Sequence, residues 1–122
     1  MATIRYLVKD VSRSVAFYRD LLEFTVEQEL LPSLARVRRD DLEVWLAGPT
    51  SSAGRPMPDG RRPRPGGWTR FVLEVDDLDA FVVRLTNVGV TFRNDVVSGP
   101  GGKEILLDDP DGNPIELFEA RA

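Results

Sequence analysis

Neither cysteine nor histidine occurs in the 122-residue sequence. The absence of cysteine excludes disulfide bonds, a thiol nucleophile and thiolate metal ligands. The absence of histidine removes the usual general base near neutral pH and the most common metal ligand in proteins. A catalytic triad that depends on histidine is excluded for the same reason. Any chemistry of this chain must therefore use Asp, Glu, Arg, Lys, Tyr, Ser or Thr.

Long apolar runs and basic stripes are missing as well. No window approaches the roughly 20 apolar residues of a membrane-spanning helix, and residues 1–10 lack the apolar core of a signal peptide. We therefore expect a cytoplasmic protein without a membrane partner. The formal charge is −4, with 16 basic against 20 acidic side chains, and this balance disfavours a nucleic-acid partner.

The first half of the sequence predicts one strand, one helix and three further strands. Residues 3–9 are β-prone, and Asp10 is placed to cap a helix over residues 11–22, with Ser12 and Ser14 on its exposed face. Short strands are predicted at residues 24–29, 33–39 and 42–47.

The same order of elements returns in the second half. A strand at residues 68–75 leads to Asp77, which is placed to cap a helix over residues 78–88 that ends at Gly89. Three strands follow, at residues 91–97, 104–107 and 114–119. The sequence thus predicts an α+β fold of two βαβββ modules, residues 1–48 and 68–122. Because one module cannot cover both faces of its curved sheet, the modules must pack together or against a second chain, and we predict a single domain over residues 1–122.

The segment between the modules, residues 49–67, has a different composition. Prolines and glycines alternate along it, and four arginines punctuate it: Arg55, Arg61, Arg62 and Arg64. Such a segment has little to bury, so we predict a long loop without secondary structure that is mobile, or ordered only beside a ligand or partner chain.

Two motifs, one in each module, resemble those of the vicinal oxygen chelate family, which includes glyoxalase I, bleomycin-resistance proteins and extradiol dioxygenases. The first is the family's Asp, Ser-x-x-Phe-Tyr and Leu-Gly-Phe pattern, matched here by Asp10, Ser14, Phe17, Tyr18, Leu22 and Phe24, with Glu23 in place of the glycine. The second is its Asp-Pro-x-Gly-Asn-x-Ile-Glu-Leu pattern, matched by residues 109–117. The resemblance implies two modules whose mixed sheets curl around a cleft, commonly in a homodimer.

The resemblance also implies positions for metal ligands, and most of these positions carry other residues. The first-strand ligand position corresponds to Thr3 and the second-module histidine position to Arg70, while Glu116 retains the final carboxylate and Glu43 is the best match for a fourth ligand. No imidazole or thiolate remains, and a guanidinium opposes a cation. We therefore expect no metal and no other cofactor.

Alternation along the strands predicts which side chains line the cleft. It places an apolar set toward the helices and a second set on the opposite face: Thr3, Arg5, Glu43, Trp45, Arg70, Glu74, Glu116 and Phe118. Arg70 is predicted to pair with Glu116. The alternative is that these charges form ordinary surface ion pairs on an open sheet, worth about 0–1 kcal/mol each.

These residues support three functional hypotheses. The first is a metal-independent protein that binds an unknown small molecule, similar to the bleomycin-resistance branch. The second is a metal-free enzyme with a Glu general base, for which Glu116 is the main candidate and Glu43 and Glu74 are alternatives. The third is a metal-dependent lyase, isomerase or dioxygenase, which the ligand replacements disfavour. The sequence leaves open whether the protein is an enzyme.

Overall fold

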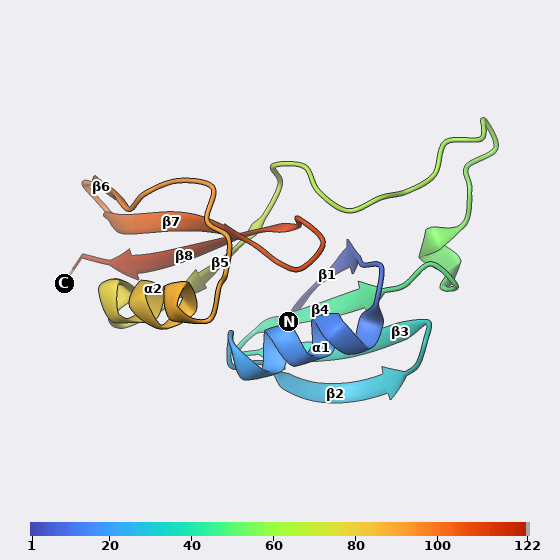
Figure 1. The fold of residues 1–122 in the computed structure, drawn as a ribbon, viewed down its shortest axis with the longest axis horizontal. Coiled ribbons are helices and arrows are strands. Elements are labelled where there is room, and N and C mark those ends of the chain that lie inside the picture. Colours follow the sequence, from blue (N-terminus) through green and yellow to red (C-terminus); the bar gives the residue numbers. More distant parts are fainter. Residues whose placement is uncertain (122) are drawn as a thin grey trace. The chain divides into compact units, whose positions relative to one another are not determined.

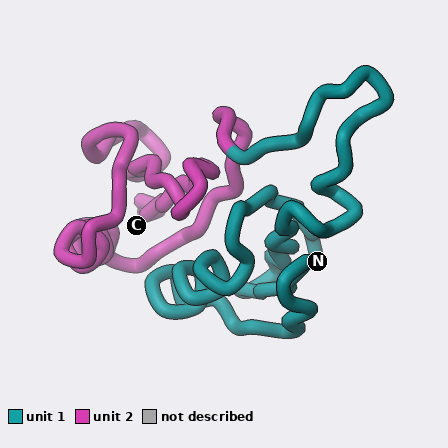
Figure 2. The backbone as a smooth tube through the Cα atoms, turned by 45° about the vertical axis from the view of Figure 1, so that its right-hand side comes forward, with its two compact units in different colours: residues 1–65 teal, residues 66–122 magenta. Residues whose placement is uncertain are grey.

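Each half of the chain forms a four-stranded mixed sheet with one helix (Figure 1). This computed structural model describes residues 1–121. The chain divides into two compact units, of which the first is Met1–Pro65 and the second begins at Gly66 (Figure 2). The predicted α+β class with two βαβββ modules is confirmed. That the modules form a single domain stays a prediction.

The first unit contains β1 (Ala2–Leu7), α1 (Val11–Asp20), β2 (Thr25–Leu30), β3 (Leu34–Arg39) and β4 (Leu42–Ala47). Its strand order is β1-β4-β3-β2, with β1 parallel to β4 and the other pairs antiparallel. A short 3₁₀ helix, η1 (Ser52–Gly54), follows β4.

The second unit repeats this plan. It contains β5 (Phe71–Glu74), α2 (Leu78–Asn87), β6 (Val97–Gly99), β7 (Gly102–Asp108) and β8 (Pro114–Ala120), in the strand order β5-β8-β7-β6. Here β5 is parallel to β8, as β1 is to β4. Both helices begin at the predicted caps: Asp10 accepts a hydrogen bond from the Arg13 amide at 3.2 Å, and Asp77 from the Ala80 amide at 3.0 Å.

Each unit has its own apolar core between helix and sheet. In the first unit the fully or almost fully buried side chains are Val11, Val15, Tyr18, Leu22, Val37, Val44 and Leu46; in the second they are Leu78, Leu85, Ile105, Leu107, Ile115 and Leu117. Burial of each such side chain contributes about 1.5–3 kcal/mol. In each unit, the core fixes the sheet against its own helix. The face of the sheet that points away from the helix carries the predicted site residues.

The structure corrects the prediction for Ser14, which is fully buried rather than exposed. The spacing of Val11, Ser14, Val15 and Tyr18 places Ser14 on the face of α1 that packs against the sheet. A small side chain fits where helix and sheet approach closely, although its hydroxyl finds no hydrogen-bond partner among the described atoms.

The strand predicted at residues 91–97 is also wrong. Only an isolated bridge joins Phe92 to Leu107, and β6 begins at Val97. The physical reason is that a side chain replaces a backbone acceptor, because Asn94 Oδ1 accepts the hydrogen bond of the Leu106 amide at 2.9 Å.

The segment predicted to lack secondary structure, residues 49–67, contains η1 and a further turn. In that turn the Met57 amide donates to the Arg61 carbonyl at 2.7 Å, and the Gly60 amide to the Met57 carbonyl at 2.9 Å. The absence of any regular element was therefore wrong, whereas mobility of this segment stays a prediction. Within residues 1–121, no helix is long and apolar enough to cross a membrane.

Candidate functional site

The predicted site residues divide between the two units. Thr3, Arg5, Glu43 and Trp45 belong to the first, and Arg70, Glu74, Glu116 and Phe118 to the second. The predicted apolar side chains are buried in both, although burial does not separate the two faces fully, because Glu43 and Glu116 on the polar face are also buried. On the helix side Tyr6, Val44, Leu46, Phe71, Leu73, Ile115 and Leu117 are buried, whereas Thr3, Arg5, Arg70 and Glu74 on the other side are exposed. The role of these residues in binding or catalysis stays a prediction.

In the first unit, Glu43 is the centre of a polar cluster. Its Oε1 accepts hydrogen bonds from Arg36 Nε and Trp45 Nε1, each at 2.6 Å, and Arg36 Nη2 reaches Oε2 at 3.3 Å. The hydrogen bonds from Arg36 and then from Trp45 hold the pKa of Glu43 below its ordinary value, although desolvation opposes them. Glu43 is therefore a fixed anion and a poor general base.

The guanidinium of Arg5 lies over the ring of Trp45, next to Glu43. Arg5 lies opposite Trp45 in the pairing of β1 with β4, and its guanidinium carbon is 4.9 Å from the centroid of the Trp45 ring. Thr3 lies opposite Glu43 two pairs earlier, on the same face of the sheet. Strand pairing thus brings all four predicted residues of the first unit onto adjacent strands, together with Arg36, which sequence analysis did not select.

In the second unit, the predicted pair of Arg70 and Glu116 is present. Arg70 Nε and Nη2 both donate to Glu116 Oε1, at 3.1 and 2.9 Å. The Glu116 side chain is only 10% exposed, against 32% for Arg70. Phe118 and Glu74 lie opposite each other in the pairing of β5 with β8 and extend the same face.

Sequence analysis missed one residue of this cluster, Glu104 on β7. Its pKa is raised, first because it shares a hydrogen bond with Glu116, then through repulsion by the Glu116 charge and through burial; Arg70 opposes the shift. The register supports this proximity, because Glu116 pairs with Leu106 and its diagonal neighbour on the same face is Glu104. The signal was available in the alternation of Glu104 and Leu106 with buried Ile105 and Leu107.

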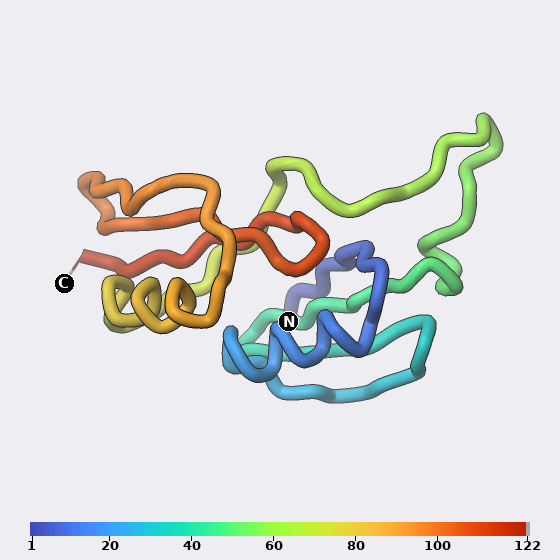
Figure 3. Tube along the Cα trace, viewed as in Figure 1, coloured from blue at the N-terminus to red at the C-terminus, as the bar shows by residue number. Residues whose placement is uncertain are grey.

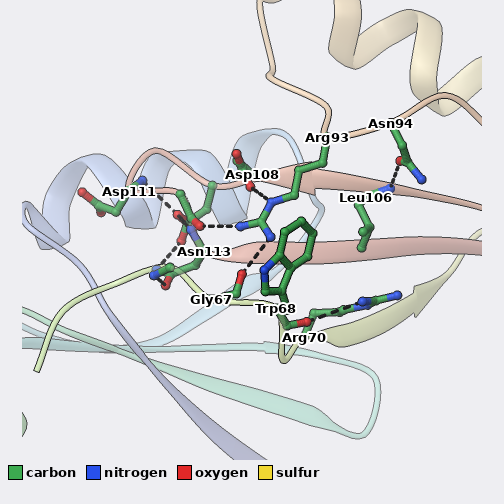
Figure 4. A network of polar contacts seen from close by, with 12 residues as sticks. Gly67, Trp68, Arg70, Arg93, Asn94, Leu106, Asp108, Asp111 and Asn113 are labelled. Atoms are coloured by element: carbon green, nitrogen blue, oxygen red, sulfur yellow. Dashed lines mark hydrogen bonds and ion pairs between the residues drawn. The ribbon is translucent and has the colours of Figure 1, made fainter.

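Arg70 immediately precedes β5, and a network of polar contacts fixes the chain that enters this strand (Figure 4). Arg93 donates to Asp108 Oδ1 at 2.6 Å and to the Gly67 and Gly112 carbonyls at 2.7 and 2.9 Å. Its guanidinium carbon also lies 4.6 Å from the centroid of the Trp68 ring. Arg93 therefore ties the chain entering β5 to the turn between β7 and β8.

That turn is itself held by a buried carboxylate. Asp109 is 4% exposed and accepts hydrogen bonds from the Asp111 and Asn113 amides and from the Asn113 side chain, at 2.9, 2.9 and 3.0 Å. Asn113 in turn accepts from the Gly66 amide at 3.0 Å. The residues of the second motif thus serve as a structural turn, and Asp109 is unsuited to a role in binding.

The donor set does not fit a transition metal in either unit. The carboxylates at the family's ligand positions, Glu43 and Glu116, already accept hydrogen bonds from arginines, and the arginine beside Glu116 stands where the family has a nitrogen ligand. A guanidinium cannot ligate a cation and repels it. In the described part of the chain, no group of three or more acidic side chains is arranged to hold a metal ion.

Comparison with known proteins gives relatives over nearly the whole chain. A curated relative, the uncharacterized protein YaeR of Escherichia coli (strain K12), is 31% identical over 119 residues, which are 95% of this chain and 92% of that protein.

Solved structures also match nearly the whole chain. A member of the glyoxalase/bleomycin resistance protein/dioxygenase superfamily from Sphaerobacter thermophilus DSM 20745 is 30% identical with a TM-score of 0.76, covering 98% of this chain and 95% of that one. Lactoylglutathione lyase from Agrobacterium tumefaciens shares the fold at 22% identity, with a TM-score of 0.75 and coverage of 98% and 92%.

The family model agrees with both the motifs and the fold. It matches residues 1–117, and so spans both βαβββ modules and the segment between them. The chain belongs to the Glyoxalase/Bleomycin resistance protein/Dioxygenase superfamily.

Proposed function

We propose that this chain is a metal-independent small-molecule-binding protein, similar in function to the bleomycin-resistance branch of its superfamily. The observation that carries the proposal is the pairing of Arg70 with Glu116, because a hydrogen-bonded arginine occupies a position where metal-dependent relatives need a ligand. The superfamily fold supports small-molecule binding in general.

The two polar faces suit a ligand that is both polar and planar. In the first unit, the stacked Arg5 and Trp45 offer a flat surface beside the fixed Glu43 anion. In the second, Nε and Nη2 of Arg70 bind Glu116, whereas Nη1 makes only a long hydrogen bond of 3.5 Å to the Trp68 carbonyl and keeps donor capacity for a ligand. Phe118, opposite Glu74, supplies an aromatic side chain on the same face. A ligand with aromatic rings and both donors and acceptors would match either of these surfaces by itself.

Isothermal titration calorimetry with bleomycin and with S-lactoylglutathione tests the proposal. We expect one of these probes to bind in the presence of EDTA, and Trp45→Ala or Arg70→Gln to weaken binding at least about tenfold. Glu23→Gln, at the positive-φ position after α1 and outside both clusters, is the control for a lost charge. Absence of binding by both probes would contradict the proposed function, and binding unaffected by both substitutions would contradict the proposed site.

A second candidate function is a metal-free enzyme in which Glu116 is the general base. The specific observation in its favour is the raised pKa of Glu104, which would hold a proton beside the Glu116 carboxylate and so pair an acid with a base. The enzyme hypothesis is tested by following the absorbance of the thioester of S-lactoylglutathione over time in the presence of the protein. Turnover that persists in EDTA and is lost at least about a hundredfold in Glu116→Gln would favour the enzyme over the binding protein.

A further inference from the structure

The first unit contains a cavity that shares no residue with the two polar faces. Its volume is about 320 Å³, within the range of small-molecule sites. It lies where the parallel strands β1 and β4 end, at Leu7 and Ala47, is partly open to solvent, and is bordered on its other side by the segment that follows β4. Figure 3 shows this segment leaving the end of β4, travelling away and turning back. Its returning part, Arg62 to Pro65, forms the other wall.

In one wall of the cavity, the backbone packs tightly around two glycines, Gly48 and Gly54. The Gly48 amide donates to the Ser33 carbonyl at 2.8 Å, and Ser51 Oγ donates to the Gly48 carbonyl at 2.7 Å. A Cβ on Gly48 would come within 2.8 Å of the Pro32 carbonyl oxygen, and one on Gly54 within 2.7 Å of the Pro49 carbonyl oxygen. Only glycine permits these approaches, so this wall is preorganised rather than shaped by a ligand.

The lining combines apolar surface with positive charge. Leu7, Ala47, Pro49 and Pro63 supply apolar atoms, and Lys9, Arg62 and Arg64 are the charged residues of the lining. No acidic side chain lines the cavity, and none of these three cations forms an ion pair within residues 1–121. The nearby Arg61, by contrast, pairs with Asp59 at 2.7 Å and does not line the cavity.

Apolar walls with unpaired cations at the rim select one class of ligand. An apolar body gains free energy from burial, and a single anionic group at its end can accept charge-assisted hydrogen bonds from the arginines. A dianion with a large polar body would lose hydration against the proline and leucine walls without compensation. We propose that the cavity between the ends of β1 and β4 and the Arg62–Pro65 wall binds a medium-chain aliphatic carboxylate.

The test uses octanoate as the probe and amide chemical shifts of the full chain as the readout. Octanoate should shift the amides of Leu7, Val8, Ala47 and Gly48, with octan-1-ol at least about tenfold weaker because it lacks the charge. The double variant Arg62→Gln/Arg64→Gln should raise the octanoate Kd about tenfold. The matched control Arg55→Gln/Arg61→Gln removes the same charge from the same segment outside the lining, and should change Kd less than twofold.

Three outcomes would overturn the proposal. One is no saturable shift of these amides by octanoate. Another is equal affinity for octanoate and octan-1-ol, which would show that the cations do not take part. The third is equal weakening by both double variants, which would show attraction by overall charge alone. Because the amide spectrum also reports the fold, a variant that is merely unfolded is recognised in the same measurement.

Discussion

Glu116 and Arg70 meet through a single carboxylate oxygen, Oε1, which accepts hydrogen bonds from both Nε and Nη2 of the arginine. The same carboxylate raises the pKa of Glu104 on the adjacent strand. Glu116 therefore contacts a permanent cation on one side and a group that competes for a proton on the other. The hydrogen bonds from Arg70 and the nearby positive charge both disfavour binding of a metal ion by Glu116.

The purified protein should contain far less than one equivalent of transition metal after dialysis. The sequence has no imidazole or thiolate, and Arg70 occupies the carboxylate that remains at a ligand position. Elemental analysis checks this, and added Ni²⁺ or Zn²⁺ should leave the Tm unchanged. Arg70→His is the complementary variant, because it restores an imidazole beside Glu116 and should create metal affinity. One tightly bound equivalent that is lost in Glu116→Ala would contradict the prediction.

The pKa of Glu104 should fall toward its ordinary value in Glu116→Gln. An amide removes the repulsion by the Glu116 charge and no longer competes as a carboxylate for the proton. Carboxyl ¹³C shifts followed against pH measure this directly. Glu74→Gln, on the same face but outside the cluster, is the control and should leave the titration of Glu104 unchanged.

The raised pKa of Glu104 also predicts the sign of this group's contribution to the pH dependence of stability. A carboxyl whose folded-state pKa lies above its unfolded value binds its proton more tightly in the folded state. Its contribution to the free energy of unfolding is therefore complete at low pH and is lost as the pH rises through the raised pKa. Urea unfolding at a series of pH values should show this decline in the difference between the unaltered chain and Glu104→Gln, because the lowered pKa of Glu43 acts in the opposite direction in both chains.

Gly102→Ala should destabilise the protein by at least about 3 kcal/mol. Gly102 has a φ of +149°, and a Cβ there would collide with the Glu119 carbonyl oxygen on the paired strand β8. The neighbouring Gly101→Ala is a matched control, because a Cβ there meets nothing within 4 Å. Its cost should stay within about 0.5 kcal/mol. Urea unfolding of both variants checks the difference, and equal stabilities would show that the turn before β7 tolerates a side chain.

The chain should be a homodimer in solution. Each sheet ends in open edge strands, β1 and β2 in the first unit and β5 and β6 in the second. Val72 on β5 is 50% exposed, so apolar surface remains on the face opposite α2. Isologous packing of two copies is the common way to cover such edges and surfaces. Light scattering that gives only the monomer mass at micromolar concentration would contradict this.

The segment of residues 49–67 should exchange its amide hydrogens faster than β5. Most of its side chains are exposed, and between η1 and Gly66 its backbone amides form hydrogen bonds only in the turn at residues 57–61. Hydrogen exchange measured by mass spectrometry checks this. If residues 62–65 close over a carboxylate, octanoate should slow exchange there. Exchange as slow as in Phe71–Glu74 without any ligand would contradict the prediction.

Local sequence determined most of the fold because the relevant interactions are local. Asp10 and Asp77 cap their helices through amides three residues ahead, and alternation along β4 and β8 places apolar Val44 and Leu117 on one face and Glu43 and Glu116 on the other. The pairing of Arg70 with Glu116 was also predictable, since the family's motifs place both on one site.

Other features were decided only by the tertiary structure, because they depend on strand register and on packing between segments that are distant in the sequence. Glu104 joins Glu116 only because β7 and β8 pair with Leu106 opposite Glu116, and no local pattern specifies that pairing. Ser14 is buried because α1 packs closely on its sheet, and the strand expected before β6 fails because Asn94 takes a hydrogen bond that the backbone would otherwise accept. The cavity beside β1 and β4 likewise exists only because a segment of proline, glycine and arginine turns back on the strand ends. Such features follow from side chains that meet across many residues of sequence, and their energies are set by geometry that composition and periodicity do not encode.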